Sequence, residues 1–361
     1  MLVYILKRLL AFIPSLLVLA VISFLLLKYS PGDPVEMMLT TQTDLHESEN
    51  NIDKKTIAEV RHQLGLDLPV FYISISDQNK LFPSIKFHGE NQFQRWLFGT
   101  SETSGLIHGD FGNSFQTNES VLSIIKKKVG WSLLLSLLSI LISFLIVVPI
   151  GLRLGRKEET SVEKRTTFFF NILYALPSFW IAILLLFFLS NPDMLNLFPV
   201  SGVSPAGGFG QNVGIIERIF KTIPYLILPL ITFTYSSFAF ISGSVKVSIQ
   251  SILKQDFIRT AKAKGLSEKN IADKHALPNV FPLLITIFSH VFPFIIGGSV
   301  ILETIFNIPG MGNTIFQAIS MQDFPVVIAV FFFTGFITMT GFLISDLLYA
   351  IVDPRIKFTA K

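Results

Sequence analysis

The sequence contains few side chains arranged for catalysis or metal binding. The chain has no cysteine, so disulfides, thiol catalysis and cysteine-ligated zinc are excluded. Its six histidines lack metal-ligand spacing, and the sequence shows no Ser/His/Asp constellation. Two glycine-containing segments, Gly155-Arg156-Lys157 and Gly265-Leu266-Ser267, do not fit the G-x-x-x-x-G-K-S/T phosphate loop. The sequence therefore predicts a non-enzymatic chain without cofactor or metal, which would need a partner to use ATP.

Ionisable side chains within or beside long apolar runs are the remaining candidates, because charge is costly inside a bilayer. His290 lies inside one run, where it would either form a hydrogen bond between packed helices or line a transport pathway. Glu303 ends the same run and would either pair in the following loop or face the pathway. Asp346, near the end of the last run, fits a structural role.

The loop that follows Glu303 has a composition suited to a gate. Pro309, Gly310 and Gly312 precede a short apolar stretch that has the length of a small helix. Such a helix would lie near the outer mouth of a pathway. These three residues therefore join His290 and Glu303 as candidate pathway or gate residues.

The composition predicts an all-α membrane protein. Half of the 361 residues are hydrophobic and only 15% are charged, whereas about a quarter are charged in soluble domains. A helix rises about 1.5 Å per residue, so about 20 apolar residues cross a hydrocarbon core of about 30 Å. The first run is longer than the apolar region of a signal peptide, although a cleaved signal is the alternative there. We predict six transmembrane helices, at 9–27, 131–152, 167–190, 222–245, 280–302 and 326–352.

The distribution of Lys and Arg predicts the orientation of the six helices. Basic residues are frequent in the loops after the second and fourth runs, whereas the loop after the third has only Arg218 and Lys221 and the loop after the fifth has none. The positive-inside rule then places both termini in the cytoplasm. Lys126-Lys127-Lys128 opposes this, but it ends a long segment where the rule is weak. The net charge of +4 is thereby explained without a nucleic-acid partner.

This organisation predicts four parts. Residues 1–30 form an N-terminal transmembrane helix, and residues 31–130 form an extracytoplasmic segment. Residues 131–352 form a five-helix core with a cytoplasmic loop at 253–279, and residues 353–361 form a cytoplasmic tail. The external segment is polar and irregular, so it is either a solvated connector or a docking surface for an extracytoplasmic partner.

The cytoplasmic loop is the most informative segment. Ile258 to Lys264 are strong helix formers, and Gly265 suits the left-handed residue just past a helix end. Ser267 is a good N-cap for a second short helix, which Pro278 would end. The result is a compact helix–turn–helix that could transmit a push from a soluble partner. The alternative is an ordinary basic loop.

The spacing of this loop resembles the EAA loop of ABC importer permeases. Arg259-Thr260-Ala261 is followed by three residues, Gly265, nine residues, His275, one residue and Leu277-Pro278. Further motifs, in the same order along the chain, are similar to those of the dipeptide/oligopeptide/nickel permease branch. They are Pro31-Gly32-Asp33-Pro34, Leu64-Gly65-Leu66-Asp67, Gly109-Asp110-Phe111-Gly112-Asn113-Ser114, Glu303-Thr304-Ile305-Phe306, Pro309-Gly310-Met311-Gly312, Asp323-Phe324-Pro325-Val326 and Asp353-Pro354-Arg355.

The resemblance implies a type I ABC importer permease in the cell (inner) membrane. Such a permease pairs with a second, similar permease and with two separate ABC ATPase subunits, and an extracytoplasmic solute-binding protein delivers the substrate. The implied cargo is peptide, with nickel or another small solute as the alternative. A secondary transporter, a different class, would predict charged pairs at the midplane and inverted repeats, and the sequence shows neither. The residues implied in contact with the ATPase are Arg259, Thr260, Ala261, Gly265, Leu277 and Pro278.

Overall fold

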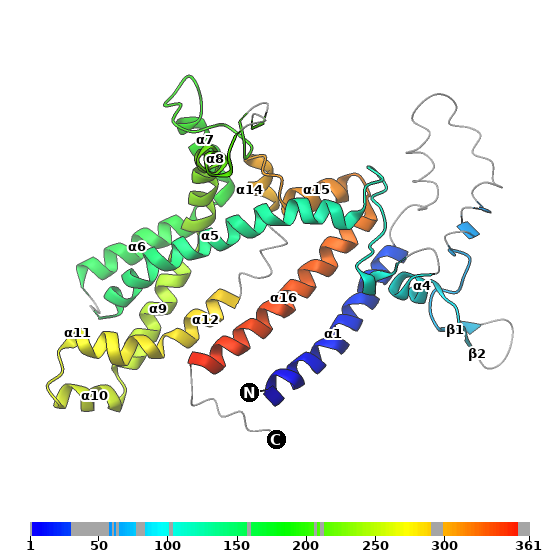
Figure 1. Ribbon diagram of the computed structural model, residues 1–361. Coiled ribbons are helices and arrows are strands. Elements are labelled where there is room, and N and C mark those ends of the chain that lie inside the picture. Colours follow the sequence, from blue (N-terminus) through cyan, green and yellow to red (C-terminus); the bar gives the residue numbers. More distant parts are fainter. Residues whose placement is uncertain are drawn as a thin grey trace. The chain divides into compact units, whose positions relative to one another are not determined.

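The structure is a computed structural model that describes residues 2–29, 58–59, 61–62, 65–76, 84–100, 104–156, 160–205, 208–209, 213–289 and 299–352 (Figure 1). It is mostly helical, as the sequence predicts. Three helices are long and apolar enough to cross a membrane, namely α1 (Leu2–Lys28), α5 (Val121–Arg156) and α16 (Phe324–Val352). Counting each of two bent helix pairs as one span gives up to five. The count of six stays a prediction, because residues 290–298 of the fifth predicted span lie outside the described residues.

The chain divides into two compact units. One comprises Met1–Leu9, Lys128–Thr314 and Phe336–Lys361, and the other comprises Leu10–Lys127 and Ile315–Gly335. Helices α1, α5, α16 and α15 (Met311–Ser320) contribute residues to both units. The other elements of the first unit are α6 (Ser161–Ala175), α7 (Ser178–Leu189), α8 (Ile215–Tyr235), α9 (Phe238–Leu253), α10 (Asp256–Ala263), α11 (Glu268–Asn270), η2 (Ile271–Ala276), η3 (Leu277–Asn279), α12 (Phe281–Ser289) and α14 (Val300–Ile305).

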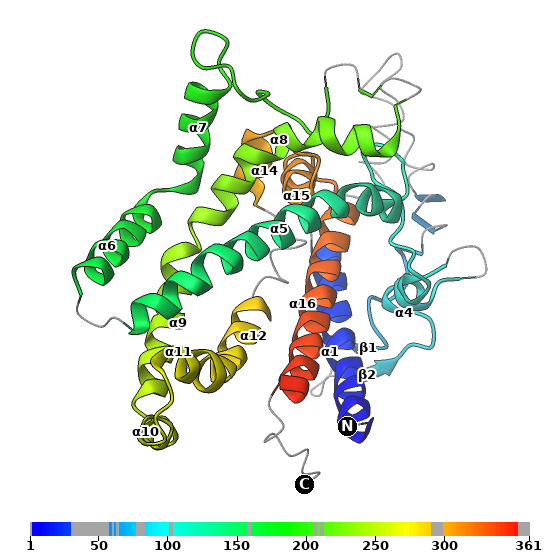
Figure 2. The ribbon, with the colours of Figure 1, turned by 60° about the vertical axis from the view of Figure 1, so that its left-hand side comes forward.

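The third predicted span is two helices instead of one. Helices α6 and α7 meet at an angle of 89° (Figure 2). Leu176 caps α6 in an extended conformation, with ψ at 123°, and Pro177 precedes the first turn of α7. A proline disfavours the α conformation of the residue before it and removes a backbone donor. Pro177 therefore separates two helices, although it lies within the single span predicted at 167–190.

The fourth predicted span is also bent, without a proline at the bend. Helices α8 and α9 meet at 46°, and the break falls at Ser236 and Ser237. Tyr235 Oη donates a hydrogen bond to the carbonyl oxygen of Leu176, 2.9 Å away. This bond ties the second bend to the first, and it satisfies a carbonyl at the end of α6.

Two apolar clusters hold the first unit together. One packs α9 against α5, α6, α12 and the loop at 253–279, with Val245, Ile249 and Ile258 all fully buried at its centre. The other packs α5, α7, α8 and α14 around Leu135 and Leu228. Glu163 at the start of α6 pairs with Lys246 on α9, and only 9% of the Glu163 side chain is exposed. These contacts fix the helices that carry the loops described below.

The second unit contains a small fold at the C-terminal end of α1, called the external subdomain below after its predicted location. An antiparallel hairpin pairs β1 (Ile73–Ser76) with β2 (Ser84–Phe87), and α4 (Gln92–Phe98) and the 3-10 turn η1 (Leu106–His108) follow. The ring of Phe24 on α1 lies 5.4, 5.3 and 5.6 Å from the rings of Phe71, Phe93 and Trp96. The described part of the segment 31–130, which the composition predicts to be polar and irregular, therefore includes a small folded subdomain.

Two motifs from distant parts of the sequence meet in this second unit. Ser114 Oγ and the Phe115 backbone N–H donate hydrogen bonds to the carboxylate of Asp323, at 2.5 and 3.0 Å. The ring of Phe111 lies 5.0 Å from that of Phe333 on α16. Asp323 immediately precedes α16 and is only 5% exposed. The segment that leads into α5 is thereby anchored to the start of α16.

In the same unit, the His62 Nδ1 atom lies 2.7 Å from Asp67 Oδ2. This hydrogen bond lowers the pKa of the Asp67 carboxyl below its ordinary value. Both side chains are exposed, so the pair is a surface contact of small energetic weight.

Candidate functional site

The loop Asp256–Asn279, which is predicted to be cytoplasmic and is called the coupling loop below after its predicted role, folds as two short helical arms joined by a tight turn. The first arm is α10, and Gly265 has φ of +76° just after it. The N–H of Gly265 donates to the Lys262 carbonyl at 2.9 Å, and the N–H of Leu266 donates to the Ala261 carbonyl at 3.3 Å. This pair of bonds is the Schellman helix ending, which requires a left-handed residue. The predicted role of Gly265 in the turn is confirmed.

The second arm begins at Ser267, as predicted. Its side chain accepts a hydrogen bond from the Asn270 N–H at 3.4 Å. The arm then widens into a π-helix, η2, and tightens into the 3-10 turn η3 that contains Leu277 and Pro278. Pro278 has no N–H to continue a regular helix. The side chain of Asn279 donates to the His275 carbonyl at 2.7 Å and so supplies a donor to this irregular turn.

One face of the coupling loop is buried and the other is exposed. Ile258, Ala261, Ile271 and Ala276 are at most 4% exposed and pack into the apolar cluster on α9. Every residue from 262 to 270 is exposed. This arrangement holds the base of the loop rigidly and projects its tip away from the helix bundle (Figure 1).

The exposed face is basic and carries two large apolar side chains. Phe257 is 39% exposed and Leu266 is 37% exposed. Arg259 and Thr260 are exposed on the same arm, and Arg259 contacts Asp256 at 3.3 Å. Exposed apolar side chains on a rigid, charged protrusion are typical of a protein-docking surface.

The outer-loop candidates form a second compact group around Glu303. Its side chain is completely buried. Ser132 Oγ, from α5, donates to Glu303 Oε1 at 2.7 Å, and the Asn313 N–H donates to Glu303 Oε2 at 3.0 Å. The Met311 N–H in turn donates to Ser132 Oγ at 2.7 Å. The carboxylate therefore ties the loop that follows α14 to α5; this group is called the Glu303 clamp below.

The two glycines of the outer loop leave room for this carboxylate. A Cβ atom placed on Gly310 would lie 2.5 Å from Glu303 Oε2 and 2.6 Å from Ser132 Oγ. One placed on Gly312 would lie 3.0 Å from Glu303 Oε2 and 2.8 Å from the backbone nitrogen of Val300. Pro309 precedes them and is half-buried. The sequence predicts Glu303 from its charge and the two glycines from the composition of the loop. The structure places Glu303 in direct contact with Gly310 and Gly312.

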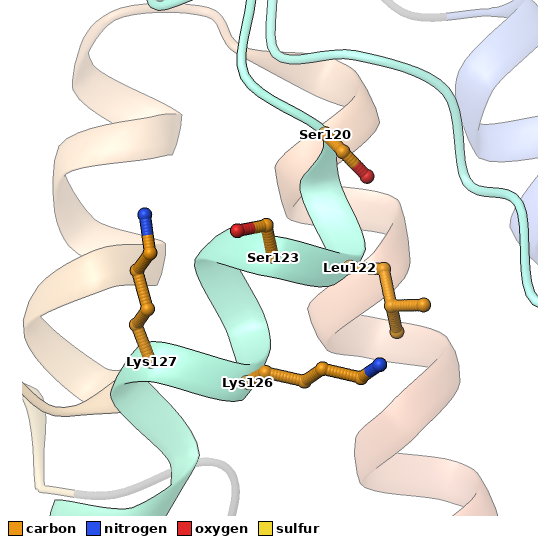
Figure 3. A pocket seen from close by; sticks show the side chains of 5 residues that line it. All are labelled: Ser120, Leu122, Ser123, Lys126 and Lys127. Carbon is orange, nitrogen blue, oxygen red and sulfur yellow. The ribbon is translucent and has the colours of Figure 1, made fainter.

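A basic pocket lies at the start of α5, in the second unit. It has a volume of about 410 Å³, and Figure 3 shows Lys126 and Lys127 pointing to different sides of the helix. Lys127 forms an ion pair with Glu119, which also accepts a hydrogen bond from Ser123 Oγ at 2.8 Å. Part of the positive charge that opposes the predicted orientation is therefore neutralised locally. The lining residues are Ser120, Leu122, Ser123, Lys126 and Lys127.

The structure brings some predicted site residues together and separates others. The six coupling residues all lie in the coupling loop, although Ala261 is buried and Leu277 is half-buried. Glu303, Gly310 and Gly312 meet in the clamp. His290 lies outside the described residues.

Two residues that hold these regions together were not predicted from the sequence. Ser132 is 171 residues from Glu303, and nothing in its local sequence marks it as a partner. Tyr235, which bonds the bend at Leu176, sits in an apolar run like any aromatic residue of a membrane helix. A weak signal existed only for Ser132, because serine recurs at 132, 136, 139 and 143 and so follows one face of α5.

Sequence comparisons match nearly the whole chain. The profile of a family described as "Binding-protein-dependent transport system inner membrane component" matches residues 147–358. The profile of the corresponding N-terminal region matches residues 1–137.

Relatives match over their full length. The chain is 31% identical to "Oligopeptide transport system permease protein AppB" of Bacillus subtilis (strain 168), covering 98% of this chain and 99% of AppB. It is 28% identical to "Inner membrane ABC transporter permease protein YejB" of Escherichia coli O157:H7, with 99% of both chains covered. Among solved structures, a chain of the inward-facing MetNI methionine ABC transporter aligns with a TM-score of 0.48 and 15% identity, over 64% of this chain and 97% of that one.

Proposed function

This chain belongs to the binding-protein-dependent transport system inner membrane components, and we propose that it carries peptides across the membrane and receives the force for transport at the coupling loop. The family resemblance read from the sequence motifs is thereby confirmed. The chain is a non-catalytic permease subunit of an ABC importer, in which partner subunits hydrolyse ATP.

The architecture of the coupling loop carries the proposal for force transmission. Its base is buried against α9, and its tip is exposed from residue 262 to residue 270. A push on such a tip would move α9 and α12 with it, because the loop and these helices share one apolar cluster. Arg259, Thr260, Gly265 and the exposed Leu266 would contact the ATPase, while Ala261 and Leu277 would support them from behind.

The proposal that the cargo is a peptide is based on the names of the relatives. AppB is named as an oligopeptide permease, and this chain matches it from end to end. The described residues also hold no group of three or more His, Cys, Asp or Glu side chains that could bind a metal ion. Nickel or another small solute remains the second candidate, since the solute-binding protein would set much of the specificity.

The proposed assembly contains this chain, a second permease, two ABC ATPases and an extracytoplasmic binding protein. Both termini would be cytoplasmic, which puts the coupling loop on the ATPase side and the clamp and external subdomain on the other. The Glu303 clamp would then lie at the outer mouth of the pathway, where α15 would act as a gate.

Reconstituted transport tests the proposed cargo. The complete complex is placed in vesicles with its binding protein, ATP inside and labelled peptides of two to six residues outside. Uptake that requires both ATP and the binding protein is expected for peptides. ATP-dependent uptake of Ni²⁺ without peptide uptake would reject peptide as the cargo.

A further inference from the structure

A cavity of about 370 Å³ lies within the unit that contains Lys128–Thr314. Eight of its fourteen lining residues are serine or threonine, and the other six are Phe, Ile or Leu. The described lining therefore contains hydroxyl groups and apolar groups and no charged side chain. Small-molecule sites in proteins typically have volumes of about 300–1,000 Å³, so this cavity is large enough to hold part of a ligand.

The cavity lies where the two helix pairs bend. Ser178 is the first residue of α7, directly after the break at Pro177, and Ser236 and Ser237 form the break between α8 and α9. The hydrogen bond from Tyr235 to Leu176 joins these two breaks. Irregular backbone is tolerated at membrane depth only where it is buried in protein or lines a polar cavity.

Four of the eight hydroxyl groups already donate to backbone carbonyl oxygens of nearby helix residues. Ser139 Oγ donates to the Ser136 carbonyl at 3.0 Å, Ser143 Oγ to the Ser139 carbonyl at 2.8 Å, and Thr232 Oγ1 to the Pro229 carbonyl at 2.7 Å. A hydroxyl oxygen that donates one hydrogen bond can still accept others. These groups therefore present mainly acceptors to the cavity.

Ser178 and Ser236 differ from the others. In the part of the chain that the structure describes, neither side chain has a hydrogen-bond partner, and both are half-buried. Each can donate and accept at once, which suits both the N–H and the C=O of a peptide group. A hydroxyl-lined cavity thus offers complementary bonds to any peptide backbone, whatever its side chains.

We propose that this cavity is a transit site of the translocation pathway, at which Ser178 and Ser236 hydrogen-bond the backbone amides of the passing peptide. The inference rests on the proposed peptide import. Phe233 and Phe240 line the same cavity and give apolar peptide side chains a surface to pack against. Because neutral hydrogen bonds are weak individually, the peptide is released again without a large barrier.

Alanine variants in the reconstituted complex test the hydrogen bonds. Ser178→Ala and Ser236→Ala should each lower the peptide transport rate about 2- to 10-fold, by the same factor for acidic, neutral and basic peptides. Thr340→Ala is the matched control, because the Thr340 hydroxyl donates to Phe336 in α16 at 2.8 Å and does not line the cavity. Native rates in both serine variants, or losses confined to peptides of one charge, would overturn the proposal.

Single cysteines give a second, independent measurement, since the native chain has none. Ser236→Cys should react with a small water-soluble thiol reagent during ATP turnover, and a transported peptide should slow the reaction. A thiol whose labelling rate does not respond to peptide would also reject the transit site. If the native complex itself imports no peptide, the proposed function fails, and that result is distinguishable because it appears before any substitution is made.

Discussion

The coupling loop and the Glu303 clamp both depend on glycine, but for opposite physical reasons. Gly265 in the coupling loop has φ of +76°, and a Cβ atom placed on it would meet nothing within 4 Å. Gly310 and Gly312 in the clamp are not among the residues with positive φ, yet a Cβ atom on either would lie within 3.0 Å of the Glu303 carboxylate. The first glycine satisfies a backbone angle, and the other two leave space for a side chain.

This difference separates a docking surface from a structural support. The turn at Gly265 is exposed, and we propose that the ATPase covers it in the complete importer. The clamp is closed, because its carboxylate is fully buried and already accepts bonds from Ser132 and Asn313. We therefore expect substitutions in the clamp to lower stability, and substitutions in the turn to lower transport.

The largest effect on stability is expected for Gly310→Val. The new side chain would overlap Glu303 Oε2 and Ser132 Oγ, and overpacking of a closed site costs about 3 kcal/mol at the upper end of its usual range. The thermal unfolding midpoint of the purified complex should fall, with less protein in the membrane. Gly130→Val is the control, because a Cβ atom there meets nothing within 4 Å. Equal midpoints for the two variants would show that the clamp is not closed.

A smaller loss of stability is expected for Glu303→Ala. Removing the carboxylate leaves the Ser132 hydroxyl and the Asn313 N–H without their acceptor, at a cost of about 2 kcal/mol. The double variant with Glu303→Ala and Gly310→Val should lose less stability than the sum of the losses of the two single variants. The reason is that the shortened side chain at 303 no longer overlaps the new side chain at 310. Additive losses in this double-mutant cycle would contradict direct contact between the two residues.

Gly265→Val should act mainly on transport. A β-branched residue at positive φ costs about 1–3 kcal/mol, and the strain falls on an exposed turn instead of on the helix bundle. We expect near-normal amounts in the membrane, weaker ATPase association and loss of transport. Gly243→Val, at an open position in α9, should keep both association and transport. Native transport by Gly265→Val would place the coupling contact elsewhere.

The smallest effect is expected at the rim of the coupling loop. Arg156 on α5 lies 3.0 Å from Asp273, and both side chains are partly exposed. Exposed ion pairs contribute about 0–1 kcal/mol, so Arg156→Ala should shift the unfolding midpoint little and leave transport intact. A loss comparable to that of Glu303→Ala would show that this pair, and not the apolar base, holds the loop.

Local features of the fold were predictable from the sequence. The turn at Gly265 and the cap at Ser267 depend on a few neighbouring residues, and both are as predicted. The positions of α1 and α16 follow from apolar length alone. Pro177 indicates a helix break in the sequence, because a proline disfavours the α conformation of the preceding residue, here Leu176. The prediction of a single span at 167–190 did not include this break.

Long-range features were not predictable in the same way. The bend at Ser236 and Ser237 has no proline and depends on a bond from Tyr235 to a helix 59 residues away. The clamp needs Ser132, which approaches Glu303 only after α5 and α14 pack together. Spacing within a single segment carries no information about such contacts.

Cross-linking from the tip of the coupling loop tests directly whether the ATPase binds there. A single cysteine at Lys264, in a chain that otherwise has none, carries a short photoreactive group in the assembled, transporting complex. A second variant carries the same group at the exposed residue Lys86 of the external subdomain. We predict that Lys264→Cys cross-links to the ATPase subunit and that Lys86→Cys does not. An assembled, active complex in which Lys264→Cys gives no ATPase cross-link would contradict the assignment of the coupling loop.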